Sequence, residues 1–138
     1  MTADRIDLLY LHAADMGIEV EWRDLGDRRR GEYWHDDRLI VLNSRLTRAQ
    51  ATAALAHEVG HAVHGDRCSS PSAESRADET GASLIIEPDE YEAAECMNGE
   101  HPGALARHLD VTPRLILAWR RWYHQAHGPV ERDGDQTP

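Results

Sequence analysis

The chain has 138 residues, and 15 basic against 25 acidic side chains give it a formal net charge of −10. This length fits one domain with a modest core, and the acidic balance argues against a surface built to bind a polyanion. Its two cysteines, Cys68 and Cys96, form no CxxC pair, and no secretory signal or membrane-spanning apolar run is present. We therefore expect a cytoplasmic protein with reduced thiols and no contact with a membrane.

The N-terminal part of the sequence predicts one helix and three short strands. Apolar residues recur at helical spacing from Ile6 onward, and the helix is expected to end near Gly17. The stretches IEVEW, EYWHDD and RLIVLNS then read as strands. We expect them to form a small antiparallel three-stranded sheet.

A capping box predicts the start of the second helix. In TRAQ, Thr47 can accept a hydrogen bond from the first turn, while the side chain of Gln50 reaches back to the Thr47 amide. The helix is expected to run from about Arg48 to His64, because Gly65 suits a helix C-terminus.

The C-terminal half predicts further helices. One opens near Ala73 and must end before Pro88, one short helix lies in the acidic segment that follows, and two more flank Val111-Thr112-Pro113. We expect a single domain over residues 1–127, with a core of about 18–90 and a C-terminal helical segment of about 91–127. Residues 128–138 are predicted to form a disordered tail.

The second predicted helix carries an HExxH motif. His57 and His61 are one turn apart on one face, so both imidazoles can reach one metal ion. Glu58 lies between them without facing the metal directly, where it can act on a coordinated water whose pKa zinc lowers to about 7. This motif also occurs by chance, so a third ligand must decide whether the site is real.

The next predicted helix supplies candidates for that third ligand. Glu74 and Asp78 are again one turn apart, and the small residues Ala77 and Gly81 near them would let this helix lie close to the first. We predict that Glu74 is the third zinc ligand and that Asp78 accepts a hydrogen bond from the far nitrogen of a ligating imidazole. This is the thermolysin-type arrangement, since the rival HExxHxxGxxH pattern would place its third ligand at Arg67.

Other polar side chains have less certain places in such a site. His64 shares the helix face with the two histidines, but a fourth protein ligand would close the coordination sphere, so we interpret it as a favourable charge at the helix C-terminus. The donor that would stabilise the oxyanion stays open among six residues, which are Tyr33, His35, Tyr91, His101, His108 and Tyr123.

These motifs resemble the ImmA/IrrE family of small metallopeptidases. The likeness runs from roughly Gly31 to Trp119, in RLIVLNSRLT, ATAALAHEVGHAVHG, ESRADETGASLIIEP and ALARHLDVTPRLILAW. It implies an α+β fold in which an N-terminal helix, a small sheet and the HExxH and ExxxD helices form a minimal zincin core, followed by helix-turn-helix-like helices. It also implies that Zn²⁺ is bound by the two motif histidines and Glu74, with Glu58 as the catalytic acid and base.

The chain departs from the family pattern at two positions in ESRAD. Arg76 stands where an acid is common, and Asp78 stands where Asn is common. Neither change touches an expected ligand, so both bear on substrate preference more than on the chemistry.

The resemblance implies a zinc-dependent endopeptidase that cleaves a protein partner, a helix-turn-helix transcriptional repressor of phage or mobile-element type, and so relieves repression. The alternative is a non-catalytic transcriptional regulator or anti-repressor with a structural zinc, acting through its C-terminal segment. Glu58 favours the enzyme, because a structural zinc site has no use for a carboxylate beside an open coordination position.

The C-terminal segment is basic within an acidic chain. Its four arginines, Arg107, Arg114, Arg120 and Arg121, could contact DNA as in a helix-turn-helix. The rest of the chain carries a large excess of negative charge that repels phosphates, so we do not expect DNA binding.

Overall fold

The chain has the α+β architecture predicted from the sequence. The computed structural model describes the backbone of residues 4–136 and the side chains of residues 4–127. Its elements in chain order are α1 (Arg5–Asp15), β1 (Glu19–Arg23), β2 (Gly31–Trp34), β3 (Leu39–Asn43), α2 (Arg48–His64), α3 (Pro71–Ile85), α4 (Pro88–Asn98), α5 (Pro102–Leu109) and α6 (Pro113–Gln136).

The sheet is mixed, with β3 in the centre. β2 pairs antiparallel with β3, as predicted, but β1 pairs with β3 in parallel, with Glu19 opposite Leu39. The prediction of a wholly antiparallel sheet is therefore wrong for one of its two strand pairs. The physical reason is burial: all five residues of β3 are buried, so this apolar strand takes the central place between two more polar edge strands. Because the chain reverses after β1 and again after β2, β1 then runs in the same direction as its neighbour β3.

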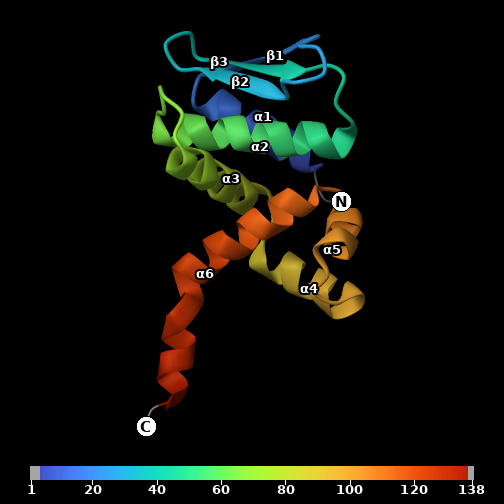
Figure 1. Cartoon of the computed structure of the whole chain (residues 1–138), viewed down its shortest axis with the longest axis vertical. Helices are drawn as coiled ribbons and strands as arrows, with labels where there is room; N and C mark the ends of the chain where they lie inside the picture. Colours follow the sequence, from blue (N-terminus) through green and yellow to red (C-terminus); the bar gives the residue numbers. More distant parts are fainter. Residues whose placement is uncertain (1–3, 137–138) are drawn as a thin grey trace.

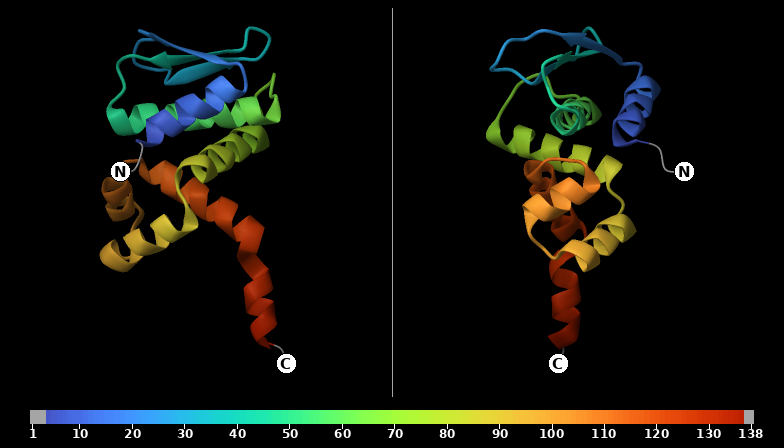
Figure 2. Two further views of the ribbon diagram at one scale, coloured as in Figure 1. Left: turned by 180° about the vertical axis from the view of Figure 1, so that it is seen from behind. Right: turned by 90° about the vertical axis from the view of Figure 1, so that its right-hand side faces the viewer.

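The sheet and the helices form layers around α2. In Figure 1 the sheet covers one side of α2 and α3 lies on the other, and the right-hand view of Figure 2 shows α1 beside α2 beneath the sheet. Ile40 and Leu42 on β3 and Leu55 and Val59 on α2 are fully buried between these layers. Each such side chain stabilises the fold by about 1.5–3 kcal/mol.

The ends of α2 lie where the sequence predicts them. Thr47 Oγ1 accepts a hydrogen bond from the Gln50 amide at 3.3 Å, and Gln50 Oε1 accepts one from the Thr47 amide at 3.0 Å. Gly65 follows in the left-handed conformation, with φ 64°, which an L side chain rarely adopts. The capping box and the glycine stop are both confirmed.

α2 and α3 touch backbone to backbone at two reciprocal points. A Cβ on Gly60 would overlap the carbonyl oxygen of Ala77, and a Cβ on Gly81 would overlap that of Ala56. The close approach predicted from the small residues of α3 is confirmed. Its counterpart on α2 is Gly60, the glycine inside HEVGH, whose role in packing has no periodic signal in the sequence.

The last three helices form a second group beyond α3. α6 packs across α3 and then projects away from the body of the protein, while α4 and α5 lie along its first half (Figure 1). The apolar residues that the sequence assigns to this segment are all buried, namely Leu105, Leu109, Val111, Ile116 and Trp119.

α6 continues to Gln136, although a disordered tail was predicted from residue 128. The side chains from residue 128 and the backbone of residues 137–138 lie outside the described residues, so the disorder of the tail stays a prediction. The division of the domain into a core of about 18–90 and a helical segment of about 91–127 also stays a prediction. No helix in the described range is long and apolar enough to cross a membrane.

Replacing Gly60 by Ala should lower the stability of the protein. The new methyl group meets a backbone carbonyl that cannot turn aside, so the helices must separate. Such overpacking costs up to about 3 kcal/mol, whereas the gain in helix propensity is about 1 kcal/mol, so we expect a net loss of roughly 2 kcal/mol. Urea unfolding measures the change, with Gln125→Ala on an exposed position of α6 as the control. Equal stability of Gly60→Ala and the wild type would contradict the close contact.

Candidate metal centre

His57, His61 and Glu74 converge on one point between α2 and α3. Their ligand atoms lie within 4.8 Å of one another. His57 Nε2 lies 2.8 Å from Glu74 Oε1 and 3.1 Å from His61 Nε2, and His61 Nε2 lies 3.0 Å from Glu74 Oε2. Two imidazole nitrogens and one carboxylate are the donor set of catalytic zinc sites, so this cluster fits a divalent metal.

Asp78 holds the far side of the His57 ring. His57 Nδ1 lies 2.6 Å from Asp78 Oδ1, and Asp78 Oδ2 accepts a hydrogen bond from Arg114 Nε at 3.0 Å and forms an ion pair with Arg114 Nη2 at 2.9 Å. Burial acts to raise the pKa of Asp78, but its bonds to His57 and Arg114 outweigh burial and keep that pKa below its ordinary value. An ionised carboxylate beside Nδ1 favours the tautomer with its proton on that nitrogen, which leaves the lone pair on Nε2.

Asp66 contacts the far side of the His61 ring, as Asp78 does for His57, although no pattern in the sequence indicates this role. His61 Nδ1 lies 2.8 Å from Asp66 Oδ2, and Asp66 Oδ1 accepts from Arg76 at 2.9 Å. Asp66 lies in the loop after α2, where helical spacing carries no signal. Arg76, one of the departures from the family pattern, thus has a structural role, and each histidine is backed by an aspartate and an arginine.

Glu58 is the buried carboxylate of the site. Only 7 % of its surface is exposed, and burial raises its pKa above the ordinary value. β2 passes directly over it, because a Cβ on Gly31 would lie 3.5 Å from Glu58 Cγ. The first residue of β2 therefore closes one side of the site.

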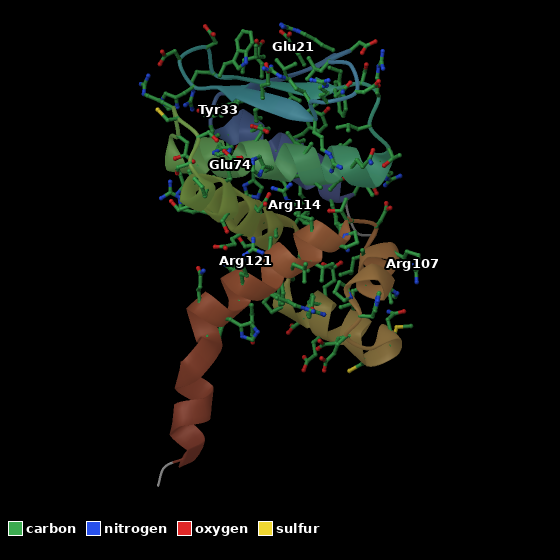
Figure 3. All side chains as sticks on the ribbon, in the orientation of Figure 1. Glu21, Tyr33, Glu74, Arg107, Arg114 and Arg121 are labelled. Atoms are coloured by element: carbon green, nitrogen blue, oxygen red, sulfur yellow. The ribbon has the colours of Figure 1, made fainter. Side chains whose placement is uncertain are left out.

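The cluster opens into a cleft with two arms, and Gly31, His57, Glu58 and Glu74 line both. The larger arm has a volume of about 370 Å³ and extends toward the loop before β2 and the start of α6. The smaller arm, about 230 Å³, extends toward Tyr33 and the loop between α2 and α3. Figure 3 shows Tyr33, Glu74 and Arg114 in succession from the sheet to α6.

Of the six candidate oxyanion donors, Tyr33 lines the cleft beside Glu58. Its hydroxyl is 2.8 Å from His35 Nδ1, and burial raises its pKa, which keeps the phenol protonated. Tyr91 and Tyr123 line a groove between α4 and α6, away from the cluster. The two remaining histidines lie at α5, where His101 caps its start and His108 lines a pocket shared with α1.

His64 and three of the four C-terminal arginines contact polar side chains of the protein other than the three ligand candidates. His64 Nε2 lies 2.8 Å from Thr80 Oγ1, outside the metal cluster. Arg114 is bound to Asp78, and Arg121 contacts Glu79 at 2.8 Å. Arg120 donates to Tyr91 Oη at 2.6 Å. These arginines hold α6 to the rest of the protein.

Comparison with protein families finds a match over residues 13–114, to the family described as Peptidase_M78, IrrE N-terminal-like domain. This range runs from α1 to the first turn of α6 and contains the metal cluster together with Asp66 and Asp78. A comparison with curated proteins finds no match.

Exchanging Glu74 for Gln should weaken zinc binding more than exchanging Asp78 for Asn. The first change removes a ligand atom, while the second removes a group that orients one, which typically costs about 10–100-fold in metal affinity. We expect one zinc per chain in the wild type, measured by elemental analysis and by competition with a chelator. Glu92→Gln, an exposed change on α4, serves as the control. Full zinc occupancy in Glu74→Gln would move the third ligand to Glu79 or Asp78.

Proposed function

Because the chain belongs to the Peptidase_M78 family of IrrE N-terminal-like domains, a metallopeptidase family, we propose that it is a zinc-dependent endopeptidase acting on a protein partner. One observation carries the proposal: the buried carboxylate of Glu58 opens into the same cleft as the cluster of two histidines and one glutamate. A purely structural metal site would have no use for this carboxylate.

We assign the metal to His57, His61 and Glu74. Three protein ligands leave a coordination position for substrate or water, as in catalytic zinc sites. When bound there, zinc supplies a Lewis acid that polarises the scissile carbonyl and makes water more acidic. The aspartates behind the two rings keep each Nδ1 protonated and each Nε2 free to bind.

Glu58 is the proposed general base and acid. Burial raises its pKa, which makes its carboxylate a stronger base than an exposed glutamate. It takes a proton from the attacking water on one of its carboxylate oxygens and returns that proton to the leaving amine. The closeness of Gly31 keeps side-chain bulk away from the carboxylate.

Tyr33 is the proposed oxyanion donor. Tyr33 lines the smaller arm of the cleft, and its hydroxyl is held by His35; the proposed role of this hydroxyl is to donate to the oxygen on which charge develops during attack. Its pKa is raised, so it stays a donor at neutral pH.

The proposed substrate is a helix-turn-helix transcriptional repressor, whose cleavage would relieve repression in the cytoplasm. This part rests on the resemblance of the sequence to metallopeptidases of phage and mobile elements. The rival function, a non-catalytic regulator that binds DNA through the C-terminal helices, has less support because Arg114, Arg120 and Arg121 are bound within the protein.

Glu58→Gln should keep the fold and the zinc but lose cleavage. The amide is nearly isosteric and the residue is no ligand, yet an amide cannot accept the proton. General acid–base catalysis contributes about 10²–10⁴ in rate, and we expect a loss of that size. The assay is co-expression with candidate helix-turn-helix repressors from neighbouring genes and mass spectrometry of their fragments, with Glu92→Gln as the control. Full cleavage by the zinc-loaded Glu58→Gln protein would defeat the mechanism.

Tyr33→Phe should lower kcat by about 10²-fold, the effect of removing one oxyanion donor, and leave KM nearly unchanged. The phenylalanine keeps the ring and removes the hydroxyl alone. His35→Gln is the companion variant, because it removes the imidazole that holds the hydroxyl while the hydroxyl itself remains. A wild-type kcat in Tyr33→Phe would exclude the tyrosine from this role.

A further inference from the structure

The larger arm of the cleft is lined by three arginines, in a chain with a net charge of −10. Arg28 and Arg30 come from the loop between β1 and β2, and Arg114 comes from the first turn of α6. The same arm is lined by His57 and Glu58, so the three arginines share one cavity with the proposed catalytic residues.

In this arm most of the carboxylates have partners within the protein, whereas two of the three arginines have none among the described side chains. Its three carboxylates are those of Glu58, which is buried, Glu74, which faces the two histidines, and Asp78, which is bound to His57 and Arg114. Arg28 and Arg30 are exposed, and among the described side chains neither has an ion-pair partner. Among the described side chains, the arm therefore offers two exposed cations without an ion-pair partner, and its one carboxylate without such a partner, Glu58, is buried.

Hydrogen bonds from Asn43 on β3 hold the loop that carries Arg28 and Arg30. The buried side chain of Asn43 donates to the carbonyl oxygens of Gly26 at 2.8 Å and Arg29 at 2.6 Å, and accepts from the Leu25 amide at 3.2 Å. The backbone N–H of Asn43 also donates to the backbone carbonyl oxygen of Arg30 at 2.9 Å. A fixed loop loses less entropy when its side chains bind a ligand.

We propose that the larger arm is a subsite for an acidic side chain of the substrate, which Arg28 and Arg30 bind next to the scissile bond. A carboxylate is the anion that fits, because a planar guanidinium can donate two parallel hydrogen bonds to its two oxygens. The subsite rests on the proposed peptidase function for its role in cleavage, but not for its ability to bind a carboxylate.

The smaller arm has no arginine without an ion-pair partner among the described side chains. Its arginine, Arg67, contacts Asp36 at 2.5 Å, and its aspartate, Asp66, is bound to His61 and Arg76. An acidic residue on the substrate should therefore be preferred on one side of the scissile bond and not on the other.

A direct test measures peptide binding to the zinc-loaded Glu58→Gln protein. Fluorescein-labelled octapeptides of Ala, Leu and Ser carry one Glu, Gln or Lys, which is moved through the eight positions. At the best positions we expect the Glu peptide to bind about tenfold more tightly than the Gln peptide, the size of one charge-assisted hydrogen-bonded pair, and the Lys peptide more weakly than either. The preference should shrink at about 1 M salt, where charges are screened beyond about 3 Å.

Two double variants of this protein carry the same change in net charge. Arg28→Glu with Arg30→Glu should abolish or reverse the preference for the Glu peptide. Arg29→Glu with Arg107→Glu should keep it, because Arg29 contacts Glu32 instead of the cleft and Arg107 lies on α5, far from Glu74 in Figure 3.

The unlabelled peptides are then incubated with the zinc-loaded wild type, and the products are identified by mass spectrometry. Cleavage that ignores the acidic residue would overturn the subsite and leave the peptidase function standing. A Glu preference in binding without cleavage of any peptide or of the repressor would keep the subsite and count against the peptidase function. Absence of binding by every peptide, or equal binding of the Glu and Gln peptides, would overturn the subsite.

Discussion

The contact between α2 and α3 sets the geometry on which the site depends. Two glycines, Gly60 and Gly81, bring the backbones of the helices together at reciprocal points. Only at this separation can the short side chain of Asp78 and the carboxylate of Glu74 both reach the ring of His57. The metal cluster is thus a product of helix packing, and the glycine inside HEVGH serves that packing.

The sequence predicts the elements of this protein better than their arrangement. The ends of α2 follow from Thr47, Gln50 and Gly65, whose effects are local and act within one turn. The parallel pairing of β1 with β3 could not be read in the same way, because it depends on which strand is most completely buried once the sheet meets the helices.

The site residues also divide into those placed by local helical spacing and those placed only by the folded arrangement. The two histidines and the acids of α3 lie one turn apart on their helices, so periodicity alone places each pair on one face. Asp66 reaches His61 from a loop, and Tyr33 reaches the cleft from an edge strand, so neither has a periodic signature. The role of Asn43 was equally hidden, since its partners are backbone atoms of the loop between β1 and β2.

Arg114 links the two halves of the protein, because it donates to Asp78 from the first turn of α6 while Asp78 holds His57. Metal binding at the proposed site and the packing of α6 on α3 would therefore be coupled in free energy. Such coupling is reciprocal. If the packing of α6 on α3 raises the metal affinity of the site by some factor, metal binding stabilises that packing by the same factor. In these terms the first turn of α6 is an allosteric element: a change that separates Arg114 from Asp78 would weaken the proposed metal site from outside the ligand set.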